Sequence, residues 1–453
     1  MKIILENFGI IERFEFDTDD DFTFIIGANN TGKSYAMTAV YLIIKNLPYL
    51  IEDFNSEFIH KNITLLKSPL EQEEFKQALK AEDKDSIEAL SDNSDIKGDL
   101  NNGVFIKNLN NSFKNSFDSI ENLQNQYNNN DLNIIISTYF FIFHIKIKNG
   151  IFYFEVIGNG YENSSDRFRE ICIEQISKDN YDEDNEEFNY KASIDNLQKE
   201  IFSELKDLKN IYYLPASRSG IYQSMNSFGQ IFAELSQKRT EISYDIKIPT
   251  MSVPISDYYI NLVSIKENSD KKNLEIEKIA SEIENNILNG KVSFNKENKK
   301  LTFLPNGTDL NLDLAFTSSM VSEITFIVAY LKYIINNNEN NIIMIEEPEA
   351  HLHPEVQIEL LKKFIELSKL NVKIIITTHS DYMLDQLNNL ILSKDVNINK
   401  ASCLFFKESE KGTRVINVNV SELGIKDENF IYTSEKLYNE KLNFIDNLNK
   451  YED

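Results

Sequence analysis

Four short apolar runs stand out in the distribution of hydrophobic and polar residues along the chain. They cover 22–26, 210–214, 341–345 and 371–377, and polar or turn-forming residues bound each of them. Runs of this length are typical of strands that are buried on both faces of a sheet. Helical periodicity follows the runs, so the pattern predicts an α/β fold that contains strand–helix units.

Alternating patterns and further helical patterns surround these runs. Hairpins are predicted over 2–16 (turn at Gly9), 134–157 (turn at 148–150) and 401–419. Three more strands are expected at 291–295, 300–304 and 309–314. Helices are expected at 71–90, 193–208, 221–237, 254–266, 271–289, 319–335 and 434–449. The stretch 48–130 is polar and rich in Asn, which indicates an inserted helical lobe.

Composition and charge limit the class of protein. The chain has 453 residues, 42% of them hydrophobic, which indicates one large domain with insertions or two domains. It lacks a signal pattern and a long apolar run, so we expect a cytoplasmic protein outside the membrane. Cys172 and Cys403 lack metal-ligand spacing and are expected to be reduced core thiols.

The net charge of −25 bears on the partners of the chain. A nonspecific DNA binder neutralises phosphates with Lys and Arg, and this balance opposes such binding over most of the surface. The charge favours a protein partner, or nucleic acid held by another subunit. A local basic groove remains an alternative.

A phosphate-binding loop follows the first apolar run. The residues from Gly27 to Ser34 fit the pattern G-x-x-x-x-G-K-[ST], with a strand before and a helix after. The motif predicts that nucleotide phosphates contact Gly27, Ala28, Asn29, Asn30, Thr31, Gly32, Lys33 and Ser34, and the adjoining Tyr35. Lys33 would reach the β- and γ-phosphates of ATP, and Ser34 would hold Mg²⁺.

Paired carboxylates end the third apolar run. Glu346 and Glu347 follow 341–345 directly, and a Mg-nucleotide site needs one acid for the metal and another for the attacking water. Adjacent strand residues point to opposite faces, so the two acids cannot share one role. We assign Glu346 to Mg²⁺ and Glu347 to the general base. Two acids that merely cap a strand are the alternative.

A histidine ends the fourth apolar run. Ligands of parallel sheets bind at the carboxyl ends of strands, where His379 could contact the γ-phosphate and orient the water. A structural histidine is the alternative. A zinc site at His351 and His353 is disfavoured, because no third ligand candidate accompanies them.

Together these motifs resemble the ABC-type ATPase head of the SMC/RecF group, and more closely the bacterial AAA_15/AAA_21 and overcoming-lysogenisation-defect (OLD) ATPases. The resemblance covers about 1–47 plus 290–420. It is carried by Asn7-Phe8, Gly27 to Ser34, the string Glu346-Glu-Pro-Glu-Ala-His-Leu-His-Pro354, and Thr377-Thr-His-Ser380. It implies a mixed central sheet flanked by helices, an N-terminal antiparallel β-subdomain and helical insertions.

The same resemblance implies a division of the chain. The head would comprise 1–47, with the phosphate loop, and 290–453, with the signature, carboxylate and histidine motifs. The segment 48–130 would be a helical insertion, and 131–289 a middle region of a β-hairpin and helices.

The family also predicts residues that act in a dimer. A signature loop of one protomer closes over the nucleotide of the other, and Ser318 and Ser319 stand at the corresponding place. The family usually has a glycine near Met320, which this chain lacks, and plain helix capping is the alternative for the serines. Arg218 resembles an arginine near the nucleotide edge, and a surface ion pair is its alternative.

The resemblance implies an ATPase that dimerises head to head around two nucleotides, and assembly of such dimers into higher oligomers is a further possibility. The residues after His379 are too few for the Toprim nuclease domain of OLD proteins. We therefore expect a separately encoded effector, a nuclease or toxin, in antiphage defence. A RecF-like DNA-repair or DNA-clamping ATPase and a nucleotide-gated scaffold with little turnover are the alternatives. A P-loop kinase is disfavoured, because it has no use for the carboxylate string or His379.

Overall fold

A computed structural model describes residues 1–53, 103–158, 202–225, 251–265 and 273–425. Short gaps within these ranges fall at 126, 128–129, 140, 207, 296, 298 and 336–338, and a few residues between 436 and 444 are also described. Cys172, the predicted helix at 71–90, most of those at 193–208, 221–237 and 434–449, and most of the predicted lobe at 48–130 lie outside the described residues.

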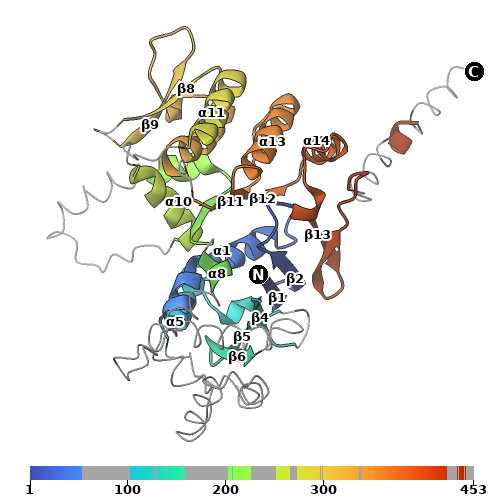
Figure 1. The fold of residues 1–453 in the computed structure, drawn as a ribbon. Coiled ribbons are helices and arrows are strands. Elements are labelled where there is room, and N and C mark those ends of the chain that lie inside the picture. The colour runs from blue at the N-terminus through green and yellow to red at the C-terminus, as the bar shows by residue number, and fades with distance from the viewer. Residues whose placement is uncertain are drawn as a thin grey trace, which may run out of the picture.

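A mixed sheet of eleven strands organises the molecule (Figure 1). Its order is β6-β5-β4-β1-β2-β14-β13-β3-β12-β11-β7. The strands are β1 (Lys2–Phe8), β2 (Ile11–Asp17), β3 (Phe22–Gly27), β4 (Asn133–Ser137), β5 (Phe141–Lys148), β6 (Ile151–Gly158), β7 (Asn210–Leu214), β11 (Asn341–Glu346), β12 (Val372–Thr378), β13 (Ala401–Ser409) and β14 (Gly412–Val418). The run from β6 to β2 is antiparallel, whereas β13, β3, β12, β11 and β7 are parallel.

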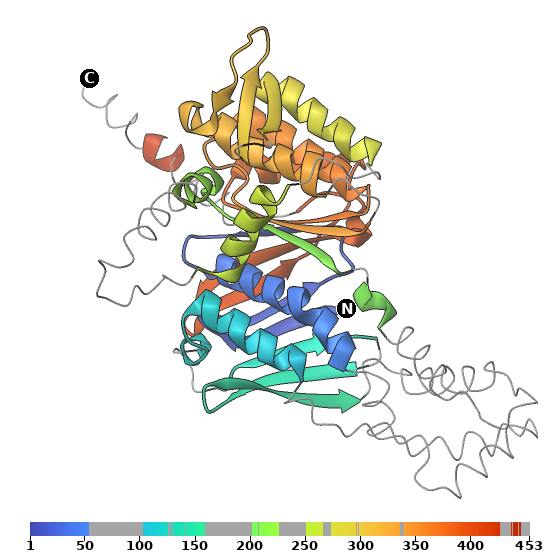
Figure 2. The same ribbon diagram turned by 90° about the vertical axis from the view of Figure 1, so that its left-hand side faces the viewer.

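Helices cover both faces of this sheet. On one side lie α1 (Lys33–Asp53) and α5 (Val104–Phe117), which pack side by side with β6 against α5 (Figure 2). On the other side lie α11 (Leu274–Ile283), α12 (Ser319–Ala329), α13 (Pro354–Ser368) and α14 (Asp381–Leu392). The described residues also form α8 (Ser203–Lys206), a helical segment at 218–225, and α10 (Val253–Val263). Short π-helical turns lie at Glu284–Leu288 and Tyr330–Ile334, and 3-10 turns lie at Glu121–Leu123, Leu314–Phe316 and Ile398–Lys400.

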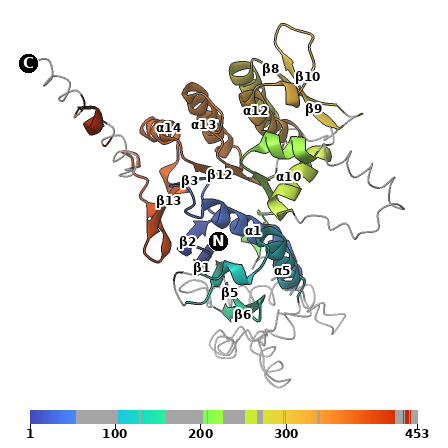
Figure 3. The ribbon, with the colours of Figure 1, turned by 180° about the vertical axis from the view of Figure 1, so that it is seen from behind.

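A small second sheet lies at the end of the molecule opposite to β5 and β6 (Figure 3). It consists of β8 (Gly290–Asn295), β9 (Lys300–Pro305) and β10 (Leu312–Asp313). The first two strands confirm the prediction, whereas the strand predicted over 309–314 is reduced to two residues because a 3-10 turn begins at Leu314.

The apolar runs are continuous because each strand faces two cores. On β11, Ile342 and Met344 join the core that contains α1 and α5, while Ile343 and Ile345 join the core beneath α12 and α13. Successive side chains of a strand point to opposite faces, so a strand covered on both faces needs apolar residues at every position. No helix among the described residues is both long and apolar enough to span a bilayer.

Local predictions for the central strands, the hairpins and the N-cap of α14 are confirmed, with two corrections. The helix after the phosphate loop does not stop at 47, because Leu47 and Leu50 keep its apolar face buried past Pro48, and the predicted boundary lies inside α1. The strand predicted over 134–147 is two strands, because Thr138 accepts a hydrogen bond from the N–H of Phe141 in a turn.

Candidate functional site

The three sequence motifs meet at one edge of the sheet. Glu346 lies opposite Thr377 in the β11–β12 register, and Thr378 lies opposite Ile26 in the β12–β3 register. The parallel strands β3, β11 and β12 therefore end together, and their last residues lead directly into the phosphate loop, Glu347 and His379. This is the place where parallel α/β sheets bind ligands.

Two glycines let the phosphate loop take its shape. Gly27 has φ +149°, and a Cβ there would lie 2.5 Å from the carbonyl oxygen of Phe406 on β13. Gly32 has φ +92°, and its Cβ would lie 3.1 Å from side-chain carbons of Ile10 and Ile11. The loop can therefore press against β13 and the β1–β2 turn only with glycine at these positions.

Five of the nine predicted phosphate contacts are exposed. Ala28, Asn29, Asn30 and Ser34 are exposed at the loop, and Tyr35 is 45% exposed. Thr31 is buried instead, and its hydroxyl donates to the carbonyl of Ala28 at 2.8 Å, which braces the loop from inside.

Lys33 is folded back onto the loop itself. Its Nζ donates to the carbonyl oxygens of Gly27 at 3.1 Å and Ala28 at 2.7 Å. Burial lowers the pKa of Lys33 to about 8, opposed by the negative charge of Glu347. The ammonium is thus held in a partly desolvated site where a phosphate oxygen can replace a loop carbonyl as its acceptor.

Glu346 has the surroundings of a cation ligand. It is 8% exposed, and its Oε2 accepts the N–H of Ala216 at 3.3 Å. Its Oε1 is buried and makes no well-aligned hydrogen bond among the described residues, although the hydroxyl of Tyr213 interacts with the same carboxylate. Burial and then this carboxylate raise the pKa of that tyrosine. A buried carboxylate with an incompletely satisfied oxygen is stabilised by a nearby cation, and Mg²⁺ prefers oxygen ligands. The carboxylate and the exposed hydroxyl of Ser34 therefore fit a Mg²⁺ ion.

Glu347 departs from the strand in a left-handed conformation. Its φ is +43°, and its N–H donates to the carbonyl oxygen of Thr377 at 3.0 Å. This turn leaves its side chain 44% exposed, with Oε1 3.8 Å from Nε2 of His379. Burial and then the charge of Lys33 lower the pKa of His379, so the imidazole is neutral near neutral pH. A carboxylate beside a neutral imidazole can accept a proton from water.

Glu349 is a site residue to which the motifs assigned no separate role. Its Oε1 accepts the backbone N–H of His379 at 2.7 Å, and burial raises the pKa of its carboxyl. It thereby fixes the segment that carries the histidine. The sequence shows Glu349 as the third acid of the string from Glu346 to Pro354. It does not show that the partner of this carboxylate is the backbone amide of His379.

Arg218 is fully buried, so the alternative of a surface ion pair is wrong. It lies directly behind the paired carboxylates, and a role at the nucleotide edge stays a prediction. It donates to the backbone carbonyls of Pro215 and Glu346 at 3.3 and 2.8 Å, and its Nε lies 3.0 Å from Oε2 of Glu323. The physical reason is that an arginine with no exposed surface must satisfy its donors internally.

The serines of the predicted signature loop are exposed at the start of α12. The Oγ of Ser318 accepts the N–H of Val321 at 3.3 Å, so its capping role is confirmed, and a contact to a second protomer stays a prediction.

His351 and His353 meet no third ligand, since the described residues contain no group of three His, Cys, Asp or Glu arranged to hold a metal.

Comparisons with known proteins agree with this geometry. Residues 1–384 match the family model AAA_15, described as an AAA ATPase domain. Endonuclease GajA from Bacillus cereus (strain HuB5-5) is 25% identical over 392 residues, which are 80% of this chain and 52% of the relative. The chain thus spans about half the length of that relative.

Solved structures of SMC heads also align with the chain. The SMC head bound to the C-winged helix domain of ScpA has a TM-score of 0.38 and 11% identity, covering 93% of this chain and 98% of that one. The SMC head domain from Thermotoga maritima has a TM-score of 0.36 and 10% identity, covering 92% and 98%.

The family model spans most of the chain and includes the phosphate loop, the paired carboxylates and His379, which the structure brings together at one edge. The mixed sheet with helices on both faces has the architecture of an ABC-type P-loop ATPase head. The chain belongs to the AAA_15 family of AAA ATPase domains.

Proposed function

We propose that the chain hydrolyses ATP at a site completed by a second copy of itself. The observation that carries the proposal is the convergence of Lys33, Glu347 and His379, with the last two 3.8 Å apart, at the edge where three strands end. Lys33 binds phosphate oxygens, Glu347 takes the proton of the attacking water, and His379 orients that water. Ser34 and Glu346 hold Mg²⁺, which supplies positive charge against the phosphates when bound.

The second half of the site would come from α12 of a partner protomer. Ser318 and Ser319 are exposed at a helix N-terminus, where free N–H groups suit a γ-phosphate. ATP would therefore clamp two heads together and hydrolysis would release them. Higher oligomers built from such dimers belong to the same proposal.

We further propose that this dimer gates an effector of the nuclease or toxin class, in antiphage defence. The name of the relative, an endonuclease, supports a link between this type of ATPase and a nuclease. The net charge of −25 supports a protein partner over direct DNA clamping.

The variant Glu347→Gln tests the ATPase. It removes the general base and keeps the shape, so kcat should fall by about 10²–10⁴-fold while ATP-dependent dimers become more persistent. Phosphate release and sedimentation velocity with ATP measure the two effects. Glu359→Gln, at an exposed position of α13, is the control and should match the wild type.

Three outcomes would contradict parts of the proposal. Wild-type protein that binds ATP without turnover, with a Glu347→Gln variant that behaves identically, would favour a nucleotide-gated scaffold. ATP-dependent retention on DNA at physiological salt would favour a RecF-like clamp. ATP that leaves the protein monomeric at every concentration would refute the shared site.

A further inference from the structure

Arg218 and Glu323 form a fully buried charged pair. Arg218 is 0% and Glu323 1% exposed, and Nε lies 3.0 Å from Oε2 without the alignment of a hydrogen bond. The other carboxylate oxygen of Glu323 accepts the N–H and the hydroxyl of Ser219, at 3.1 and 2.7 Å. Such a pair adds little to the free energy of unfolding, because the cost of desolvating two charges offsets their attraction.

The guanidinium of Arg218 hydrogen-bonds to the backbone of the two residues that carry the site's carboxylates. It donates to the carbonyl of Glu346 at 2.8 Å and lies 3.5 Å from the carbonyl of Glu347, to which it also donates. Charged donors are stronger than neutral ones and strongest where water is excluded. Glu347 has φ +43°, a conformation that persists only when its surroundings enforce it. Arg218 provides that restraint on one side, and Thr377 provides it on the other.

Glu323 belongs to α12, the helix with the exposed N-terminus. It lies one helical turn after Ser319 and on the same side of the helix. A force applied at the start of α12 therefore reaches the carboxylate of Glu323 through a single turn of rigid helix. From Glu323 the contacts continue without interruption through Arg218 to Glu347.

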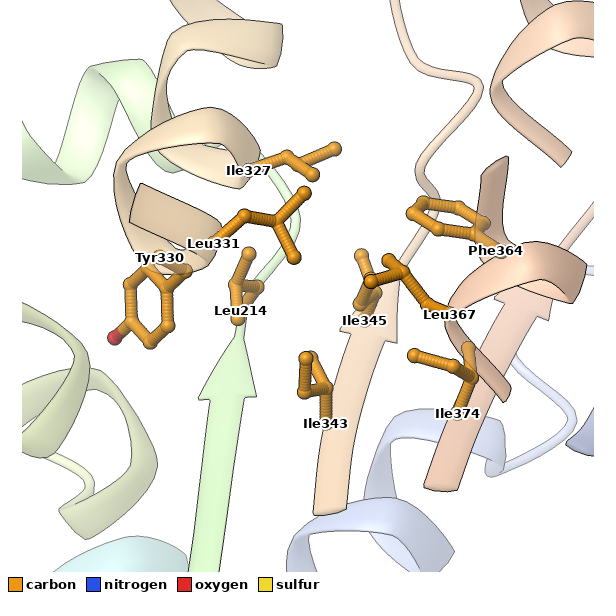
Figure 4. Close-up of a pocket in the computed structure, with 9 residues that line it drawn as sticks. All are labelled: Leu214, Ile327, Tyr330, Leu331, Ile343, Ile345, Phe364, Leu367 and Ile374. Atoms are coloured by element: carbon orange, nitrogen blue, oxygen red, sulfur yellow. The ribbon is translucent and has the colours of Figure 1, made fainter. Parts of the chain in front are cut away.

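The far end of α12 rests on a small cavity (Figure 4). The cavity, of about 10 Å³, is lined by apolar side chains from α12 and the π-helical turn after it, from α13 and from three strands: Leu214, Ile327, Tyr330, Leu331, Ile343, Ile345, Phe364, Leu367 and Ile374. The hydroxyl of Tyr330 points away from it (Figure 4) and donates to the carbonyl of Tyr258. A cavity this small and apolar stays dry, and the side chains that line it are nearly fully buried and forgo only part of their packing contacts.

We propose that Arg218 and Glu323 are positioning residues that transmit the position of α12 to the backbone of Glu346 and Glu347. Docking at the start of α12 would set the general base, so that turnover depends on a correctly seated helix. This inference rests on the proposed function for its catalytic consequence. The mechanical coupling itself depends only on the buried contacts.

The variant Glu323→Gln tests the coupling, because it removes the charge of the pair and preserves the shape. In nucleotide-free protein, hydrogen exchange of the amides of Glu347 and Ala350 should rise about tenfold or more. The amide of Glu347 donates to the carbonyl of Thr377 on β12, and that of Ala350 donates to the carbonyl of Glu347, so both bonds depend on the backbone position of Glu347 that Arg218 restrains. With ATP, kcat should fall about 10²-fold while the Kd for ATP stays within twofold, because a misplaced base slows chemistry without touching the phosphate loop.

Glu284→Gln is the matched control. Glu284 is 5% exposed, pairs with Lys332 at 2.8 Å and has no contact with the carboxylate turn among the described residues. It should lower Tm comparably and leave the exchange of Glu347 and kcat unchanged. Ser219→Ala removes one hydrogen bond to Glu323 and serves if Glu323→Gln does not fold. It should change both readouts in the same direction by a smaller factor.

The outcomes separate the two proposals. The coupling would be overturned if Glu323→Gln and Glu284→Gln had the same kcat and the same amide exchange at Glu347 and Ala350. Wild-type protein without turnover would overturn the proposed function, and the exchange measurement would still decide the coupling. Raised exchange with unchanged kcat would refute the claim that Arg218 positions the general base.

Discussion

Gly27→Ala is the sharpest test of how the phosphate loop is built. The new Cβ would lie 2.5 Å from the carbonyl oxygen of Phe406 and 2.8 Å from its Cβ, both closer than real Cβ contacts. Phe406 belongs to β13, which pairs with β3 and with β14, so it cannot move away freely. The residue also needs φ +149°, which an L side chain rarely adopts.

The expected loss of stability is the sum of the backbone strain and the steric overpacking. Backbone strain costs about 1–3 kcal/mol and overpacking about 1–3 kcal/mol, so the sum is about 2–6 kcal/mol. Unfolding entropy of about 2.1 cal/mol/K per residue over 453 residues is about 1 kcal/mol/K, if the chain unfolds as a unit. We therefore expect Tm to fall by about 2–6 °C and the Kd for ATP to rise at least about tenfold, because the displaced loop no longer fits the phosphates.

Differential scanning calorimetry and titration calorimetry with ATP measure these effects. Gly307→Ala is the control, because Gly307 also has positive φ (+76°) but a Cβ there meets nothing within 4 Å. The control should show strain alone and unchanged ATP binding. If Gly27→Ala matched Gly307→Ala in both Tm and Kd, the argument from the contact with Phe406 would be refuted.

Three further predictions follow from the site and the core. ATP affinity should fall as pH rises above about 8, because burial lowers the pKa of Lys33 to about 8 and only the protonated amine neutralises phosphate; an unchanged Kd at about pH 9 by titration calorimetry would contradict this. Glu349→Gln weakens the acceptor of the His379 amide and should lower kcat roughly ten- to a hundredfold, as a lost bond to a charged group of about 1.5–3 kcal/mol implies; phosphate release at the wild-type rate would argue against that role. Ile343→Ala enlarges the apolar cavity and should cost about 2–5 kcal/mol by urea denaturation, with a loss below about 1 kcal/mol counting against close packing around it.

The local elements were predictable because their causes are local. The glycine spacing of the phosphate loop, the apolar runs of β3, β11 and β12, and the capping Ser380 each act within a few residues. The same holds for the edge at which the motifs meet, since carboxyl ends of parallel strands must coincide. The sequence by itself therefore determined the strand–helix units and the nucleotide-binding chemistry.

Only the tertiary structure decided how distant segments complete the site. The terminal hairpin was predictable as a hairpin, yet β13 lies in the centre of the sheet beside β3, where it constrains Gly27. The sequence did not show that Arg218 is buried, that it hydrogen-bonds to the backbone carbonyl of Glu346, or that Glu323 is its counter-charge. The roles of buried charged groups depend on which partners the folded chain brings within hydrogen-bonding distance, and residue spacing along the chain does not specify those partners.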